Sequence, residues 1–265
     1  MGIQFLVLLI VALAACCMGF KKYVWFISIG YGAAIAVLGV VLMIMFHGRL
    51  TTGTVIMGVL FVIYGCRLGG YLAVREIKSA SYNTTMKNEI KDGSTMPMVA
   101  KISIWVVAAL LYLCQTSPLW FRLHNEKGID AFLIVGVIIM MLGIIVESIA
   151  DLQKNRAKKK NPGRFVDTGL FRLVRCPNYL GELLLWTGVF ISGINIYQGA
   201  VQWILVLCGF GGIVYVMFSG ARRLEIRQTK NYGSDPVYRR YVKTTPIMIP
   251  FVPIYSVARH KWLVG

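Results

Sequence analysis

The chain has 265 residues, of which 57% are hydrophobic and only 15% are charged. Soluble domains carry roughly 25% charged and about 45–50% apolar residues, so this chain is too apolar to be one large soluble core. It nevertheless has 28 Lys and Arg against 11 Asp and Glu, a formal net charge of +17. Charge and hydrophobicity must be segregated along the chain. This predicts an integral membrane protein and excludes a disordered tail protein, a secreted disulfide scaffold and an ordinary nucleic-acid-binding domain.

Apolar windows along the chain predict seven membrane spans, because a bilayer-spanning helix needs about 20 predominantly apolar residues. Lys101 lies inside the fourth window and Glu182 inside the sixth. The expected fold is an all-α integral membrane protein, a seven-transmembrane helix bundle with residues 1–265 in one membrane domain. In chain order the windows are Ile3–Phe20, Tyr23–Phe46, Thr54–Val74, Met98–Trp120, Ala131–Ala150, Tyr179–Tyr197 and Ala200–Ser219.

The positive charge is distributed as seven spans require. With alternating connections, one side of the membrane holds only Arg49, Arg122 and Lys127, whereas the other holds 24 of the 28 Lys and Arg. The positive-inside rule then predicts an N-terminus outside and a C-terminus in the cytoplasm. We expect a multi-pass protein of the bacterial inner membrane or the endoplasmic reticulum membrane.

The third window contains a tyrosine and an arginine, Tyr64 and Arg67, which share a helix face because they are three residues apart. Ionisable groups inside a membrane are costly and are usually functional. One interpretation is a polar pair that faces a cavity. The other is that Arg67 extends its side chain toward the basic side of the membrane.

A second concentration of polar residues runs from Glu147 to Glu182. Its arginines lie next to helix ends, an arrangement that suits phosphate recognition. A polybasic loop attracted to anionic lipid is the alternative, and it accounts for the run Lys158–Lys160. It does not account for the carboxylates and the asparagine at the span ends. The basic and aromatic tail after Arg222, which includes Tyr241, is read in the same way, as a contact for lipid or for nucleotide phosphate.

Several kinds of site are not expected. The six cysteines form no CxxC pair, and the three histidines are scattered, so no metal site is predicted. The glycines at 209–212 lie in the middle of a span without a preceding strand, which excludes a Rossmann fingerprint.

The run Arg164–Glu182 (RFVDTGLFRLVRCPNYLGE) resembles the C-terminal signature of the steroid 5α-reductase superfamily, and so does Tyr238–Pro250 (YRRYVKTTPIMIP). The resemblance covers roughly residues 147–250. It implies seven spans, NADPH bound in the cytoplasmic half of the bundle, and reduction of an enone C=C bond in a steroid or related lipid that enters from the bilayer. The surplus of arginines favours NADPH over NADH.

The resemblance also implies roles for individual residues. Tyr64 matches a tyrosine that donates a hydrogen bond to the substrate carbonyl, and Arg67 completes its Tyr-x-x-Arg motif; both are catalytic candidates. Residues 1–130 would form much of the lipid cavity, and residues 131–265 the cofactor-binding half. The cofactor-binding candidates, matched to the motif or lying in the same polar clusters, are Glu147, Asp151, Arg156, Lys158, Arg164, Gly169, Arg172, Asn178, Tyr179, Glu182, Arg222 and Tyr241, with Gly181 as a second motif glycine.

One position departs from the superfamily pattern. The superfamily places a carboxylate or an amide in the second span beside the tyrosine, but Tyr23–Phe46 contains no Asp, Glu, Asn or Gln. Ser28 and Tyr31 are the polar side chains within this span. The partner of Tyr64 is therefore left open by the sequence.

An S-adenosylmethionine-dependent methyltransferase is the rival enzyme class. Isoprenylcysteine carboxyl methyltransferases and phospholipid methyltransferases share an Arg-x-Pro-x-Tyr-x-Gly element, which Arg175–Gly181 fits, and a later glutamate, which Glu225 fits. The many arginines favour the reductase, since S-adenosylmethionine carries no phosphate. A non-enzymatic lipid-binding or transport protein is a third reading, which the absence of paired broken spans disfavours. The sequence gives no oligomeric state.

Overall fold

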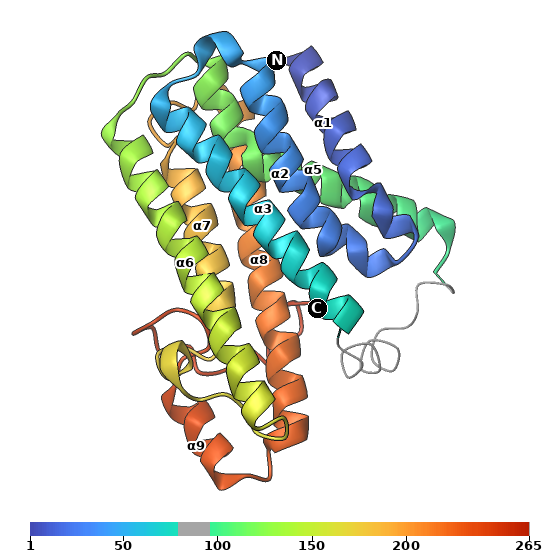
Figure 1. The fold of residues 1–265 in the computed structure, drawn as a ribbon, viewed down its shortest axis with the longest axis vertical. Coiled ribbons are helices and arrows are strands. Elements are labelled where there is room, and N and C mark those ends of the chain that lie inside the picture. The colour runs from blue at the N-terminus through green and yellow to red at the C-terminus, as the bar shows by residue number, and fades with distance from the viewer. Residues whose placement is uncertain (79–95, 265) are drawn as a thin grey trace. The chain divides into compact units, whose positions relative to one another are not determined.

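The protein is helical throughout the residues that the computed structural model describes, which are 1–78 and 96–264 (Figure 1). These residues contain no strand, so the expected all-α fold is confirmed. Lys87 and Lys91, which the charge argument counts, lie outside the described residues. The helices are α1 Gly2–Cys16, α2 Ile29–Met45, α3 Thr52–Lys78, α5 Met98–His124, α6 Ala131–Lys160, α7 Pro177–Ile191, α8 Gly199–Tyr232 and α9 Pro236–Thr244, with short 3₁₀ helices at Cys17–Phe20, Tyr23–Ile27, His47–Arg49 and Gly169–Arg172.

Six segments among the described residues are long and apolar enough to cross a membrane. The sixth expected span, Tyr179–Tyr197, corresponds to α7, which ends at Ile191 after 15 residues. At 1.5 Å per residue α7 is about 22 Å long, which is shorter than a hydrocarbon core of about 30 Å. The count of seven spans is therefore not confirmed, and the orientation of the termini stays a prediction. The six segments are Gly2–Phe20, Tyr23–Met45, Thr52–Arg75, Met98–His124, Ala131–Lys160 and Gly199–Tyr232.

Large apolar side chains remain exposed on these helices. Ile44, Val107 and Ile204, for example, are 66%, 65% and 58% exposed. In water, apolar surface of this kind marks an interaction site or an aggregation hazard, but lipid tails solvate it. The protein is a multi-pass integral membrane protein.

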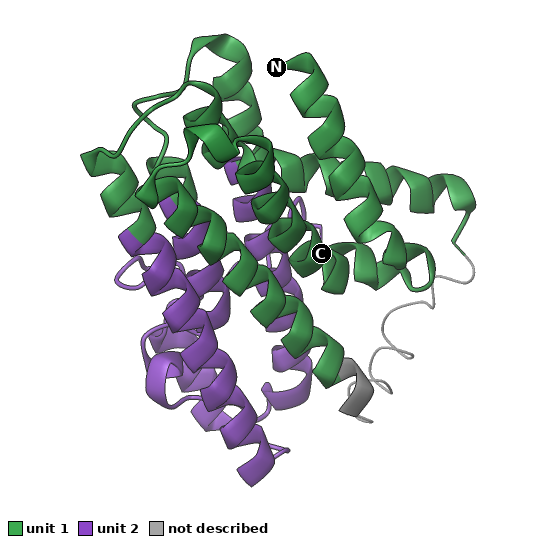
Figure 2. Cartoon of the chain, turned by 45° about the horizontal axis from the view of Figure 1, so that its top comes forward, with its two compact units in different colours: residues 1–137, 189–209 green, residues 138–188, 210–265 purple. Residues whose placement is uncertain are grey.

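The chain divides into two compact units, coloured separately in Figure 2. Unit 1 comprises residues 1–137 and 189–209, and unit 2 comprises residues 138–188 and 210–265. The boundaries fall within α6, α7 and α8. The expected division of labour between residues 1–130 and 131–265 concerns function and stays a prediction.

In unit 1, glycines bring α2 and α3 together, and the two helices run side by side in Figure 1. A Cβ atom on Gly32 would lie 2.6 Å from the carbonyl oxygen of Gly65, so neither position has room for a side chain. Small residues at helix interfaces in membranes allow such close approach. Because Tyr31 precedes Gly32 and Tyr64 precedes Gly65, this contact also brings the two tyrosines to the same level.

In unit 2, glycines allow α6 and α7 to pack closely against each other. A Cβ atom on Gly143 would lie 2.6 Å from the carbonyl oxygen of Gly181, and one on Gly181 would lie 2.6 Å from the backbone nitrogen of Glu147. In this close contact Glu147 packs against Gly181 of α7, which is the residue before Glu182. The two acidic candidates are therefore presented from adjoining helices.

The C-terminal segment of unit 2 folds back on the loop before α7. The backbone N–H of Arg175 donates to Pro246 O at 2.9 Å, and that of Cys176 donates to Ile247 O at 2.9 Å. Ile247 in turn donates to Ile254 O at 2.8 Å, which closes the segment between them. Helix α9 starts at Asp235, whose side chain accepts a hydrogen bond from Val237 N at 2.8 Å and so caps the helix.

Candidate functional site

Three tyrosines form a buried cluster between α2, α3 and α5 of unit 1. The hydroxyl of Tyr64, a residue with 0% exposure, donates to the hydroxyl of Tyr31 at 3.2 Å. The rings of Tyr31 and Tyr112 lie 4.9 Å apart. The Tyr112 hydroxyl donates to Phe26 O at 2.7 Å. The hydroxyl on which the predicted carbonyl contact depends is thus held among other tyrosines inside the membrane.

Tyr31 is the residue that the second span supplies to Tyr64. The other polar side chain there, Ser28, donates to Val24 O at 2.8 Å and so serves its own backbone. The polar partner that the second span provides for Tyr64 is thus a phenol, and not the carboxylate or amide that the resemblance implies. Tyr31 is one of the two polar side chains within this span, which is the signal in the sequence for this pairing, and it precedes Gly32, which packs closely against Gly65 of α3.

Arg67 lies one turn beyond Tyr64 on α3. Its side chain is half-buried, whereas Tyr64 is fully buried. Nearer the end of the helix, Arg75 lies over the ring of Tyr71 at 5.7 Å from its centroid. Arg67 and Tyr64 both belong to unit 1, and all the cofactor-binding candidates belong to unit 2. The role of Arg67 stays a prediction.

The loop between α6 and α7 is built around Gly169, whose φ of +61° favours glycine. A Cβ atom there would collide with the side chain of Gln153. The Gln153 Oε1 atom accepts a hydrogen bond from Leu170 N at 2.8 Å, which ties the loop to α6. The motif glycine is therefore required by local geometry, whether or not a cofactor is bound.

Lys158 is engaged with protein atoms. Its ammonium donates to Arg164 O at 2.7 Å, to the Tyr232 hydroxyl at 2.9 Å and to Pro162 O at 3.2 Å. These three bonds use the three donors of a lysine. Arg156 is exposed, and its role in cofactor binding stays a prediction.

Arg164 and Tyr241 frame an aromatic cluster outside the spans. The Arg164 Nη2 atom lies 2.7 Å from Asp167 Oδ2, and its guanidinium lies over Phe165 at 5.5 Å. Phe165 stacks on Tyr241 with ring centroids 5.4 Å apart, and the Tyr241 hydroxyl donates to Phe171 O at 2.7 Å. Burial raises the pKa of Tyr241, so this hydroxyl stays a neutral donor.

The remaining candidates differ in burial. Glu147 and Glu182 are 4% and 6% exposed. Arg172 is exposed, and Arg222 donates to the tail carbonyls of Ala258 at 3.1 Å and Leu263 at 3.2 Å. Those that are half-buried are Asp151, Asn178 and Tyr179.

Unit 2 also contains a buried ion pair whose two residues are not among the cofactor-binding candidates. Arg175 Nη2 lies 3.2 Å from Glu225 Oε1, and both residues are less than 5% exposed. The same nitrogen donates to Tyr255 O, and Glu225 Oε2 accepts from Val257 N at 2.9 Å. Both residues belong to the motif expected of a methyltransferase. Their pairing across 50 residues had no local signal in the sequence.

The hydrogen-bond donors of Arg175 bear on whether unit 2 could bind an anionic cofactor. Its Nε and Nη1 atoms are buried and have no hydrogen-bond partner among the described residues. Buried donors in native proteins are almost always satisfied, and a guanidinium with free donors suits a phosphate or carboxylate. Of the 28 Lys and Arg, 17 follow residue 150. The residues of unit 2 therefore fit a phosphate-bearing dinucleotide such as NADPH.

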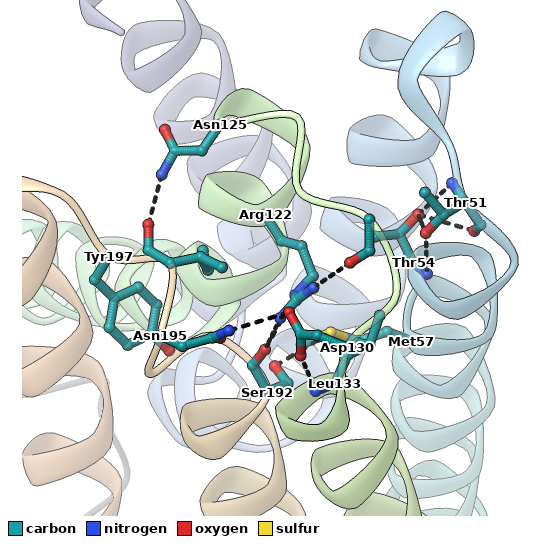
Figure 3. A network of polar contacts seen from close by, with 12 residues as sticks. Thr51, Thr54, Met57, Arg122, Asn125, Asp130, Leu133, Ser192, Asn195 and Tyr197 are labelled. Carbon is teal, nitrogen blue, oxygen red and sulfur yellow. Dashed lines mark hydrogen bonds and ion pairs between the residues drawn. The ribbon is translucent and has the colours of Figure 1, made fainter.

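A second buried network, which sequence reasoning missed, surrounds Arg122 in unit 1 (Figure 3). Arg122 is 0% exposed, and its Nη2 atom lies 2.8 Å from Asp130 Oδ2. It also donates to Ser192 O at 2.6 Å and to Gly128 O at 2.6 Å. Asn195 donates to Asp130 at 3.2 Å. Arg122 is thus paired with a carboxylate and hydrogen-bonded to carbonyl oxygens, and these contacts connect the 125–130 loop to the turn after α7.

The chain is similar to proteins of a known family. The family model described as a protein of unknown function, DUF1295, matches residues 16–245. The chain belongs to the DUF1295 family. A search of solved structures found no match to this DUF1295 chain.

Named relatives of the DUF1295 chain include reductases and a methyltransferase. Steroid 5-alpha-reductase DET2 of Arabidopsis thaliana is 26% identical over 122 residues, which cover 45% of this chain and 41% of the relative. Very-long-chain enoyl-CoA reductase of Dictyostelium discoideum is 27% identical over 150 residues, 56% of this chain and 44% of the relative. Probable O-methyltransferase ustE of Ustilaginoidea virens is 34% identical over 92 residues, 33% and 32% of the two chains.

The matches span less than half the length of each of these relatives. Together with the family match, they confirm the resemblance to the steroid 5α-reductase superfamily. Two of these three relatives carry reductase names, and the third carries a methyltransferase name.

Proposed function

We propose that this protein is an NADPH-dependent membrane reductase of a C=C bond conjugated to a carbonyl group, with a steroid or a related lipid as substrate. The observation that carries the proposal is the buried hydrogen bond between Tyr64 and Tyr31, at 3.2 Å inside an apolar span. The reductase names of two relatives support it.

Tyr64 is proposed to donate a hydrogen bond to the carbonyl oxygen of the substrate. When bound, NADPH supplies the hydride that the β-carbon of the enone accepts, and the α-carbon then takes a proton, so the C=C bond becomes CH–CH. Negative charge develops on the carbonyl oxygen during this step. A donor aimed at that oxygen in a water-excluded site stabilises the charge far more than the same donor would in water.

Tyr31 is proposed as a positioning residue. In the structure the Tyr64 hydroxyl donates to Tyr31. When Tyr64 turns its proton to a substrate carbonyl, its oxygen can accept a hydrogen bond from Tyr31, and chains of such bonds strengthen one another in a low dielectric. Tyr112, whose ring lies 4.9 Å from that of Tyr31, restricts the rotation of Tyr31.

In unit 2, Arg175 and the arginines of the 161–176 loop are proposed to hold the phosphates of NADPH. Arg175 contributes two buried donors that lack partners among the described residues. Glu147 and Glu182, presented by α6 and α7, are proposed to accept hydrogen bonds from the ribose hydroxyls or the carboxamide. Arg67 is proposed to hold Tyr64 in place.

The proposal is tested by thermal stabilisation of the detergent-purified protein with NADPH, NADH and S-adenosylmethionine in parallel. A ligand that binds only the native state stabilises it by about 2.7 kcal/mol at a hundredfold excess over its Kd. We expect the largest shift with NADPH. A shift with S-adenosylmethionine alone would overturn the proposal.

A methyltransferase is retained as a second candidate because of two specific observations. Probable O-methyltransferase ustE is similar over 92 residues, and the two motif residues of that class, Arg175 and Glu225, form an ion pair here. Glu225 is nevertheless satisfied by Arg175 and by Val257 N. The reductase also accounts for the tyrosine pair, which the methyltransferase leaves unexplained.

A further inference from the structure

A glutamine lies deep in α5, and its side-chain amide has no hydrogen-bond partner among the described residues. Gln115 is 2% exposed, and neither Oε1 nor Nε2 bonds to any of the described residues. It lies four residues from the middle of a 27-residue membrane span. Bulk water is absent at such depth, so nothing in the described part of the chain replaces the hydrogen bonds that this amide would make with water.

Burying the amide of Gln115 without a hydrogen bond costs free energy. Leaving a buried amide unpaired is unfavourable, and each such group in a native structure requires an explanation. The neighbouring polar residues on α5 need none. Thr116 donates to Tyr112 O at 3.0 Å, and Ser117 donates to Cys114 O at 2.7 Å. Gln115 alone among these three leaves both its donor and its acceptor unused.

Gln115 lies close to the proposed reaction site along the helix. It follows Tyr112 by three residues, so the two share a helix face and are about 4.5 Å apart along the axis. The ring of Tyr112 lies 4.9 Å from that of Tyr31, which pairs with Tyr64. The unpartnered amide is therefore one turn beyond the tyrosine cluster, and all four residues belong to unit 1.

We propose that Gln115 binds a hydroxyl group of the lipid substrate, at a position remote from the carbonyl that Tyr64 contacts. This inference rests on the proposed reductase function. A primary amide donates through Nε2 and accepts through Oε1, and a hydroxyl group complements both atoms. A ketone or an ether would leave Oε1 unpaired. The site thus selects a hydroxylated enone lipid over its deoxy counterpart.

The first test needs no substrate. Gln115→Met replaces the amide by an apolar side chain of similar length, so the lipid-free variant should melt at a higher temperature than the parent in detergent. Thr116→Val is the matched control, because Thr116 is buried on the same helix and already bonded; its melting temperature should not rise. A lower melting temperature for Gln115→Met would show that the amide is already bonded in the lipid-free protein and would overturn the inference.

The second test measures lipid preference. Dissociation constants are determined for a parent 3-oxo-4-ene steroid and for derivatives that carry one hydroxyl at the 11-position, the 17-position or the side chain. Two hydrogen bonds to a buried amide predict that the protein prefers at least one derivative by on the order of tenfold or more. Gln115→Met should abolish that preference and leave binding of the parent steroid unchanged, whereas Thr116→Val should retain it.

If the protein prefers no hydroxylated derivative, or if Gln115→Met retains the preference, the inference is wrong. Reduction of the parent steroid with NADPH is followed in the same samples. Turnover of the parent without any hydroxyl preference refutes the role of Gln115 alone, whereas absence of turnover with every steroid refutes the proposed function.

Discussion

Replacing Tyr64 with phenylalanine is expected to abolish most of the proposed reaction while preserving the fold. The side chain is 0% exposed, and phenylalanine fills the same space, so the variant loses the hydroxyl and with it the 3.2 Å bond to Tyr31. A neutral hydrogen bond contributes about 1 kcal/mol, which corresponds to roughly 2–4 °C in melting temperature for a protein of this size.

The expected effect on turnover is much larger than the effect on stability. Removal of one oxyanion donor typically lowers kcat by about 10²–10³-fold. Tyr31→Phe removes a bond made through Tyr64, so a loss of about fivefold, equivalent to about 1 kcal/mol, is expected. Because Tyr31 acts through Tyr64, the double variant should be no slower than Tyr64→Phe alone.

The assay follows NADPH oxidation with a 3-oxo-4-ene steroid, together with the melting temperature of each variant. Tyr71→Phe is the matched control, because it removes a hydroxyl two turns further along α3, where Tyr71 lies beside Arg75; its turnover should equal that of the parent. Unchanged turnover in Tyr64→Phe would refute the mechanism. Additive losses in the double variant would refute the positioning role of Tyr31.

Three further predictions concern Arg122, Asp130 and Cys176. Arg122→Met should lower stability by about 3–5 kcal/mol, since it removes the fully buried ion-pair partner of Asp130 and leaves the buried carbonyl oxygen of Ser192 without its donor, whereas Arg49→Met, in an exposed pair with Glu126, should cost at most about 1 kcal/mol; equal melting temperatures would contradict this. Burial raises the pKa of Asp130, but hydrogen bonds from Leu133 N, Arg122 and Asn195 outweigh it and hold the pKa below the ordinary 3.8. Its stabilising contribution should therefore be complete at neutral pH and disappear as the pH falls below about 4, a loss that Asp130→Asn should lack in acid-unfolding curves. Burial raises the pKa of Cys176 to about 12, so in a variant that retains only this cysteine a maleimide should label the thiol after unfolding and not in the native protein at pH 8.

Hydropathy alone predicted most of the helices, because lipid contact demands long apolar runs. It failed at α7, where the apolar window continued to Tyr197 but the helix ends at Ile191. The backbone there turns at Ser192, whose carbonyl accepts two hydrogen bonds from Arg122. A contact between residues 70 positions apart decides this boundary, and no local pattern encodes it.

The sequence was sufficient to name candidate site residues, but not to predict the contacts that these residues make. The sequence identified Tyr64 and the basic loop, but it did not reveal that Lys158 uses its three donors on protein atoms. Nor did it indicate that Arg175 has two buried donors without a partner among the described residues, since nothing in the local sequence distinguishes Arg175 from the other arginines of its loop. Tyr31 was visible as a polar residue, and its pairing required the glycine contact between α2 and α3.

Reduction of an enone by hydride transfer can be followed with an isotope label. The purified protein is incubated with NADPH deuterated at C4 of the nicotinamide and with a 3-oxo-4-ene steroid, and the product is analysed by mass spectrometry and NMR. We expect a saturated ketone that carries one deuterium at the former β-carbon. Recovery of unreduced steroid, together with methyl transfer from S-adenosylmethionine to a lipid acceptor, would contradict it.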